Sequence, residues 1–304
     1  MPDEKPGYQA INACRICRSR RVGNRFRLPA FTVRHCRDCG VVFLSPMPTP
    51  ETLAGLYAAD YYQERQEYFF GNIVADQDHG KEDANIQAFR QGLARLAGHQ
   101  PRRGRLLDIG CGPGIFLAMA REAGWQVQGV DVSAFAARYA RERFGIPVRV
   151  GADLTTVALP AGSFAAITLW DALEHFLDPL TQLRAAANLL AEGGILMLDV
   201  PNEASLLRIL ARGFYLASGG LFTYPVRKLY HGFHVHYFDA RALTGLLERA
   251  SLELVALHRK PIPVVKARGK PVEKLIVRLL SGLEQLLGME YELIALARRR
   301  GPAA

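Results

Sequence analysis

The stretch "GRLLDIGCGPG", residues 104–114, decides the fold of the central part of this chain. An apolar run ends in Asp108, and glycines follow on alternate positions, at Gly110, Gly112 and Gly114. A glycine-rich turn directly after a strand lets the backbone approach a nucleotide closely. The dinucleotide fingerprint G-x-G-x-x-G would need glycine at position 115, where isoleucine stands. The turn therefore predicts a nucleotide site and disfavours NAD as its occupant.

Around this turn, from about residue 104 to residue 258, short apolar runs alternate with helical patterns. Strands are expected at "RLLDIG", "QVQGVDVS", "PVRVG", "FAAITLW" and "GILMLDVP". Strands that alternate with helices form βαβ units, which build a parallel sheet with ligands at the carboxyl ends of its strands. The predicted fold is α/β, with a Rossmann-like, doubly wound and mainly parallel sheet.

An acidic residue follows each of the first three predicted strands. A carboxylate at Asp108 suits a cationic amino acid better than a pyrophosphate, and Asp131, 23 residues later, is placed to bind ribose hydroxyls. Asp153, in "VGADL", could accept a hydrogen bond from an adenine amine. Each acid alone would most often cap a helix or face solvent. Together they predict a nucleoside pocket with a charged amino acid at one end.

These motifs resemble the class I S-adenosylmethionine-dependent methyltransferases over roughly residues 100–258. "LLDIGCGPG" looks like their first motif, "GVDVS" like their ribose acid, "GADL" like their adenine contact, and "FAAITLWDALEHFLDP" like their fourth strand and the loop after it. The resemblance implies cofactor contacts for the glycine turn and for Asp108, Asp131, Asp153 with its neighbour Leu154, and Trp170 with Asp171.

Four of the five cysteines form the pattern C-x2-C-x18-C-x2-C, at Cys14, Cys17, Cys36 and Cys39. Two such knuckles around a short hairpin predict a zinc ribbon. Four protein ligands leave no position open for water, so the predicted Zn²⁺ is structural. It would stabilise a segment with almost no apolar core.

The ribbon narrows the resemblance to bacterial small-molecule methyltransferases, including sugar C-methyltransferases. That subfamily carries a Tyr-His-Glu-His signature before "YF", and the matching stretch here is "HGFHVHYFD". His234 fits the signature, whereas His231 replaces its tyrosine and Phe233 its glutamate.

Methyl transfer to a hydroxyl or carbon acid needs a base, and two segments offer one. Glu174 and His175 lie just beyond the fourth predicted strand, and His234 is the base that the resemblance favours. His175 could instead cap or pack a helix. His231 and His236 are expected to have structural or orienting roles.

The predicted organisation has four parts: a zinc ribbon at 1–48, an aromatic-rich helical linker or lid at 49–100, the S-adenosylmethionine-binding domain at 101–260 with a cap insertion at about 204–230, and a basic amphipathic helical tail at 261–304. Apolar residues recur at helical spacing in the tail: Leu275, Leu279, Leu283, Leu286, Leu287 and Ile294. This face is expected to dock on the protein itself or on a partner in a homodimer, and peripheral membrane contact is the alternative.

The net charge of +9 belongs to the two ends of the chain. Residues 1–40 carry nine Lys and Arg against three Asp and Glu, and residues 255–304 carry ten against four. The central domain is mildly acidic, which argues against nucleic acid as the substrate. The first residues lack the apolar region of a signal peptide, so a cytoplasmic protein is expected.

The expected function is therefore methyl transfer to O or C of a small-molecule acceptor, such as a sugar, a nucleotide-sugar or a lipid-like compound. Two alternatives stay open. One is an RNA methyltransferase that uses its basic ribbon to bind RNA, and the other is a non-catalytic protein that binds the cofactor.

Overall fold

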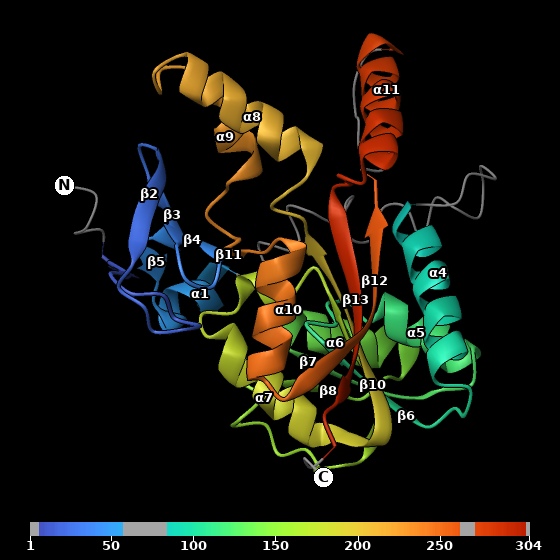
Figure 1. Ribbon diagram of the computed structural model, residues 1–304. Coiled ribbons are helices and arrows are strands. Elements are labelled where there is room, and N and C mark those ends of the chain that lie inside the picture. Colours follow the sequence, from blue (N-terminus) through green and yellow to red (C-terminus); the bar gives the residue numbers. More distant parts are fainter. Residues whose placement is uncertain (1–5, 57–83, 262–270, 302–304) are drawn as a thin grey trace.

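A computed structural model describes residues 6–56, 84–261 and 271–301 (Figure 1). Its largest element is a seven-stranded sheet with the strand order β12-β13-β10-β9-β6-β7-β8. The sheet strands are β6 (Arg105–Ile109), β7 (Gln126–Asp131), β8 (Val148–Val150), β9 (Phe164–Trp170), β10 (Leu190–Pro201), β12 (Leu252–Lys260) and β13 (Glu292–Arg299). Strands β6 to β10 pair in parallel, which confirms the predicted doubly wound, mainly parallel sheet.

Helices cover both faces of this sheet because its strands are apolar on both sides. They are α4 (Ala84–His99), α5 (Ile115–Glu122), α6 (Ala134–Phe144), α7 (Pro179–Leu189) and α10 (Ala240–Arg249). Neighbouring residues of β6 point to opposite faces. Leu106 packs in one cluster with residues of α4, α5 and α6, whereas Leu107 packs in another with residues of α7 and α10. The central strands are thus buried between two cores.

The end of the chain corrects the predicted helical tail. Residues 271–287 form the helix α11, but residues 292–299 form β13, which lies antiparallel between β10 and β12. Ile294 is 1% exposed in that strand and does not belong to a helix face. The segment reads as helical because Leu, Ala, Glu and Arg favour helices, but pairing on both edges overrides that weak preference.

The N-terminal segment forms a second, four-stranded sheet with the order β11-β4-β3-β2. Its strands are β2 (Val22–Arg27), β3 (Thr32–Cys36), β4 (Val42–Ser45) and β11 (His236–Tyr237). The predicted hairpin between the cysteine pairs is present as β2 and β3. The fourth strand comes from the histidine-rich segment, far along the chain, and pairs with β4. A strand from the later part of the chain therefore completes the ribbon sheet and links the ribbon to the central domain.

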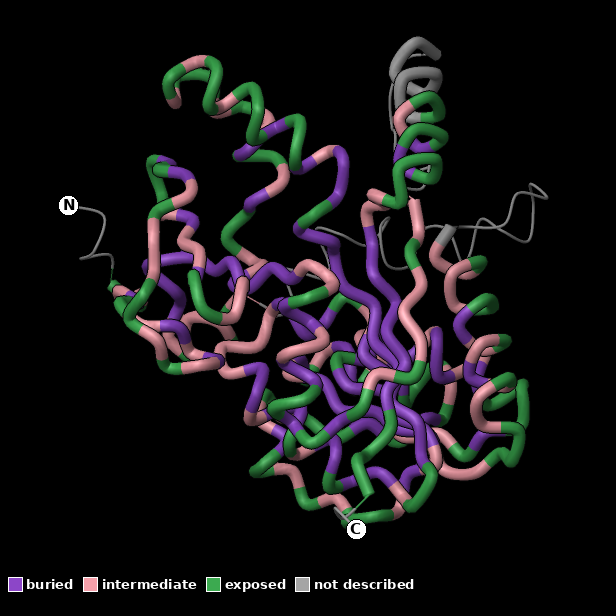
Figure 2. The backbone as a smooth tube through the Cα atoms, viewed as in Figure 1, coloured by how far each residue is buried: buried purple, intermediate pink, exposed green. Residues whose placement is uncertain are grey.

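Smaller elements complete the described chain: β1 (Tyr8–Gln9), β5 (Met47–Pro48), α1 (Pro50–Leu56), the 3₁₀ turn η3 (Leu173–His175), α8 (Leu206–Ala217) and α9 (Tyr224–Leu229). The aromatic residues of the predicted lid, at 57–70, lie outside the described residues. Helices α8, α9 and α11 stand away from the sheet on the same side of the molecule, as Figures 1 and 2 show. No helix in the described ranges has both the length and the apolar character needed to cross a membrane.

Candidate active site

The glycine turn after β6 has the left-handed backbone that its sequence requires. Gly110, Gly112 and Gly114 have φ angles of 74°, 52° and 82°. A Cβ atom at Gly114 would lie 2.9 Å from the Cβ of Ala140 on α6, and one at Gly110 would lie 2.9 Å from the Cβ of Ala172. Only glycine combines this backbone with such close packing. The turn therefore lies directly against the segment that follows β9.

Asp131 ties the turn after β6 to the turn after β7. Its side chain is buried, and its two carboxylate oxygens accept hydrogen bonds from the backbone N–H of Gly112, at 2.7 Å, and of Ser133, at 2.8 Å. Each carboxylate oxygen can accept a further bond, so this geometry is compatible with donors from a ribose. The structure thus places Asp131 beside the glycine turn, where the sequence predicts it.

The side chain of Asp108 is more deeply buried than is expected of a residue that binds a ligand at the end of a strand. It is 2% exposed, and the Thr168 hydroxyl on β9 donates a hydrogen bond to its carboxyl at 2.6 Å. Burial raises the pKa of this carboxyl to about 8, although the Thr168 bond opposes that shift, and the charge of Asp131 adds to it. Asp108 therefore carries a proton over most of the range below pH 8.

This raised pKa predicts a pH-dependent stability for the ligand-free protein. An acid whose pKa is higher in the folded state stabilises the fold at low pH, and that contribution is lost as pH rises from about 4 to 8. Relative to Asp108→Asn, the wild-type free energy of unfolding should fall over this range by at most about 1.4 kcal/mol per pH unit. Urea unfolding of both proteins at several pH values measures it, and parallel pH profiles would contradict the pKa assignment.

Asp153 and Leu154, after β8, are held by Gln182 of α7. The Gln182 amide donates to the Asp153 carboxylate at 2.9 Å, and its oxygen accepts from the Leu154 backbone N–H, also at 2.9 Å. The same carboxylate oxygen accepts from the backbone and the hydroxyl of Thr155. These bonds fix both residues at the carboxyl end of the third parallel strand.

Trp170, at the end of β9, packs into an aromatic cluster. Its ring centroid lies 5.0 Å from that of Phe89 on α4 and 5.1 Å from that of Phe116 on α5. A Cβ atom at Gly92 of α4 would lie 2.4 Å from the indole, so the helix approaches it closely. These contacts give Trp170 a packing role, and none of them supports the predicted contact with a ligand.

Glu174, His175 and His234, the candidate acid–base residues of two distant segments, lie close together, which the sequence analysis does not predict. The nearest atoms of His234 and Glu174, Nε2 and Oε1, are 3.9 Å apart, and the ring centroids of His175 and His234 are 4.5 Å apart. The backbone N–H of Val235 donates to the Glu174 carbonyl, which holds the two segments in register. The Nδ1 atom of His175 donates to the Phe233 carbonyl at 2.8 Å, so Nε2 is the acceptor in the neutral ring.

Glu174 is unusual because its carboxylate is buried among other acids. It is 1% exposed, and neither of its oxygens has a hydrogen-bond partner among the described residues. Burial raises the pKa of this carboxyl well above its ordinary value, and the charges of Asp171, Asp199 and Glu292 raise it further. Glu174 therefore binds a proton more readily than an exposed glutamate does, and a positive charge on His234, 3.9 Å away, would favour its ionised form.

Two nearby histidines, His236 and His231, have different surroundings from the Glu174–His234 pair. His236 is 1% exposed, its Nδ1 donates to the Phe176 carbonyl at 3.0 Å, and burial lowers its pKa to about 4. It is thus a neutral, structural side chain, as the sequence analysis expects. The His231 ring lies 4.2 Å from the His234 ring, centroid to centroid, and it flanks the pair.

A buried ionic network that the sequence analysis missed supports the histidine segment. Glu203, just after β10, forms ion pairs with Arg208 of α8, at 3.5 Å, and with Arg25 of the ribbon strand β2, at 3.1 Å. The Tyr230 hydroxyl donates to the same carboxylate, and the Arg208 guanidinium lies over the rings of Tyr230 and Tyr237. The sequence gives only a weak signal for this network, because Arg208 is one of two arginines in the apolar stretch 206–217.

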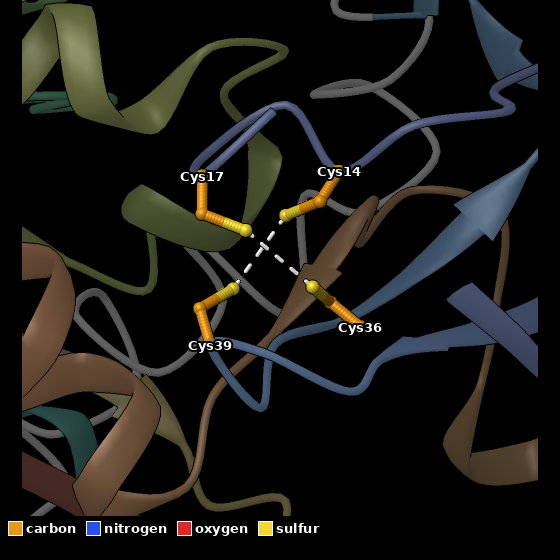
Figure 3. A group of neighbouring side chains, drawn as sticks. All are labelled: Cys14, Cys17, Cys36 and Cys39. Carbon is orange, nitrogen blue, oxygen red and sulfur yellow. Dashed lines mark hydrogen bonds between the residues drawn. The ribbon is translucent and has the colours of Figure 1, made fainter. Parts of the chain in front are cut away.

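The four cysteines of the ribbon converge as predicted (Figure 3). Their Sγ atoms all lie within 4.8 Å of one another, and the pairs Cys14–Cys39 and Cys17–Cys36 are 3.6 and 3.5 Å apart. Four thiolates bound to Zn²⁺ at about 2.3 Å lie about 3.8 Å apart, so this arrangement fits a tetrahedral metal.

The sheet, the glycine turn and the acids at the strand ends define a nucleoside-binding α/β domain. Residues 81–257, more than half of the chain, match a family described as "Methyltransferase domain". The chain therefore belongs to this family, and these residues form an S-adenosylmethionine-dependent methyltransferase domain.

Two curated relatives are named ubiquinone biosynthesis O-methyltransferase. The protein from Xanthomonas axonopodis pv. citri is 35% identical over 163 residues, which cover 51% of this chain and 65% of that protein. The protein from Ralstonia nicotianae is 32% identical over 176 residues, which cover 55% of this chain and 68% of that one. The chain thus spans about two thirds of the length of these relatives.

Solved structures share the fold at low identity. A chain from the complex between the Haloferax volcanii Trm112 methyltransferase activator and a methyltransferase superposes with a TM-score of 0.54 and 16% identity, covering 76% of this chain and 97% of that one. Geranyl diphosphate C-methyltransferase from Streptomyces coelicolor superposes with a TM-score of 0.50 and 15% identity, covering 69% and 79%.

Proposed function

We propose that the protein transfers a methyl group from S-adenosylmethionine to an oxygen or a carbon of a small-molecule acceptor. The observation that carries this proposal is the Glu174–His234 pair. Glu174 lies on the segment after β9, which packs against the glycine turn through Ala172, and His234 lies 3.9 Å from Glu174. A base is therefore close to the place where this fold binds its cofactor.

The names of the curated relatives favour an oxygen acceptor. Both are O-methyltransferases of ubiquinone biosynthesis, so a lipid-like acceptor with a hydroxyl group is the first candidate. The apolar cap at 204–230 supports the same class, because it supplies apolar side chains beside the histidine segment.

The residues of the site would act on the acceptor proton. When bound, S-adenosylmethionine would supply the electrophilic methyl group, and its sulfur would retain the electron pair of the C–S bond. His234 takes the proton of the acceptor hydroxyl as the new O–C bond forms, and Glu174 stabilises the resulting imidazolium. The hydrogen bond from His175 to the Phe233 carbonyl orients the imidazole of His175, the other histidine of the site. A positioned base of this kind contributes roughly 10²- to 10⁴-fold to the rate.

Asp108, Asp131, Asp153, Leu154 and the backbone of the glycine turn would hold the cofactor. Asp131 offers the sharpest test, because its carboxylate would accept bonds from the ribose. Asp131→Ala should weaken the binding of S-adenosylhomocysteine by about 1–3 kcal/mol in a calorimetric titration. Glu253→Ala, which removes an exposed carboxylate from β12, is the matched control. Equal affinities for the wild type and Asp131→Ala would refute this role.

Cys14, Cys17, Cys36 and Cys39 would hold one structural Zn²⁺. The four-thiolate set fits zinc chemically, and it completes the coordination shell without water. The metal would then fold the ribbon and take no part in the reaction.

A labelled-methyl assay tests the whole function. The protein is incubated with S-adenosylmethionine that carries a labelled methyl group and with a cell extract, and the labelled products are separated into lipid, small polar and RNA fractions. Label in a lipid or small-molecule fraction is expected. Label in RNA would favour the RNA methyltransferase, and an absence of label in every fraction would favour a non-catalytic cofactor-binding protein.

A further inference from the structure

Three helices on one side of the molecule, α8, α9 and α11, expose an unusual amount of apolar surface. Among the described residues, eleven of the thirteen exposed large hydrophobic side chains lie on α8, on the start of α9, on the loop between them and on α11. We call these residues the apolar surface: Ile209, Leu210, Phe214, Leu216, Leu221, Phe222, Tyr224, Leu279, Leu283, Leu286 and Leu287. Leu221 and Leu286 are 89% and 82% exposed. Soluble proteins rarely expose such clusters without a partner.

These residues are exposed although the same helices also have buried faces. Leu206 and Ala211 of α8 are buried, and Ala211 packs in a cluster with side chains of the ribbon strands. On α11, Ser281 and Glu284 are buried, while the leucines at 279, 283, 286 and 287 recur along one exposed face. The apolar surface is therefore additional to the contacts that attach the helices to the molecule.

The charges beside the α8 and α9 part of the apolar surface have one sign, whereas α11 carries acidic as well as basic residues. Residues 204–238 contain four Lys and Arg and no Asp or Glu. Arg212, Arg227 and Lys228 are exposed, and Arg278 is exposed on α11. A twofold contact between two copies of residues 204–238 would bring like charges together without acidic partners. A surface that is both apolar and anionic matches this pattern.

Helices α8, α9 and α11 extend from the side of the sheet at which the strands end in the turns proposed to bind the cofactor. Helix α8 follows the carboxyl end of β10, and α11 connects the end of β12 to the start of β13, where Lys260 pairs with Glu292. The glycine turn and η3 also follow the carboxyl ends of their strands. Figure 1 shows α8 and α11 projecting from this side of the sheet at separate places, and Figure 2 shows much of α8 and the described turns of α11 as exposed.

We infer that the apolar surface docks on an anionic lipid bilayer, with its leucine and phenylalanine side chains in the interface and its basic residues at the lipid headgroups. Amphipathic helices with Lys and Arg beside Phe and Leu bind membranes in this way. Docking at this edge turns the methyl-transfer site toward the bilayer. In that respect the inference rests on the proposed function, because it gives a lipid-like acceptor a direct path to the site.

Vesicle flotation of the full chain, without cofactor or acceptor, tests the docking. The wild type should float with vesicles of equal parts phosphatidylglycerol and phosphatidylcholine and stay unbound with phosphatidylcholine alone. The double variant Leu221→Asp/Phe222→Asp should lower the partition coefficient at least tenfold. The triple variant Arg212→Gln/Arg227→Gln/Lys228→Gln should lower it about a hundredfold, since each basic residue near an anionic surface contributes about fivefold.

A matched control replaces the two exposed apolar residues outside this surface. Val150→Asp/Val255→Asp introduces the same charge and should bind vesicles like the wild type. The inference is overturned if the wild type does not float, or if the apolar and control variants lose binding equally. It is also overturned if sedimentation shows a dimer that Leu221→Asp/Phe222→Asp dissociates, since a second copy would then cover the surface. Because the assay involves no methyl transfer, its failure leaves the proposed function standing.

Discussion

His234→Ala should lower kcat by about 10²- to 10⁴-fold and leave the affinity for S-adenosylhomocysteine unchanged. The imidazole lies 3.9 Å from the carboxylate of Glu174, whose segment packs beside the glycine turn, and the bond from Gly112 to Asp131 in the turn does not involve it. Its loss therefore removes a base without changing the cofactor pocket. Initial rates, with calorimetry on the same preparations, measure both quantities.

The Glu174→Gln variant tests whether Glu174 acts with His234 in catalysis or only packs against it. Glutamine keeps the size of the side chain but carries no charge to stabilise an imidazolium. The apparent pKa of the basic group in the kcat/KM profile should fall in this variant, and kcat should fall at neutral pH. A purely structural Glu174 would change stability without moving the profile.

His258→Ala is the matched histidine control. His258 lies on β12, where it pairs with β13, and should give wild-type kinetics when replaced. If His234→Ala and His258→Ala have equal rates, His234 is not the base. If His234→Ala instead loses cofactor affinity in proportion to its rate, the residue has a binding role.

The parallel part of the fold could be predicted from the sequence because its signals are local. Each strand from β6 to β10 is a short apolar run with a turn or an acid at its carboxyl end, and the glycine turn fixes where the first one stops. The same local signals led to Asp131 and to the four cysteines. These predictions needed no knowledge of which strands are neighbours.

The features that the sequence analysis missed depend on long-range pairing. β13 consists of residues that favour helices, but it forms a strand because it pairs with β10 on one side and with β12 on the other. Trp170 ends a strand as expected, and the packing of its ring against Phe89 and Gly92 depends on a helix that lies far earlier in the chain. The network around Glu203 joins Arg25, near the start of the chain, to Glu203 and Arg208. No pattern within a single window contains such information.

Removing zinc from the ribbon should abolish activity even though the cysteines lie outside the methyl-transfer site. The ribbon strand β4 pairs with β11, and the backbone N–H of Leu44 donates to the Val235 carbonyl. The N–H of Val235 in turn donates to the Glu174 carbonyl. The ribbon therefore fixes the segment that carries His234. A misplacement of about 1 Å at a reacting group costs roughly 100-fold in rate.

The expected results follow from this chain of bonds. Cys36→Ser should lose the metal and at least about 99% of the activity, because structural zinc contributes about 10–16 kcal/mol to the folding of small metal-binding domains. Cys111→Ala, which replaces the one cysteine outside the ribbon, should keep one zinc per chain in metal analysis. Chelation of the wild type should inactivate it, and added Zn²⁺ should restore activity. A zinc-free protein with full activity would show that the ribbon does not position His234.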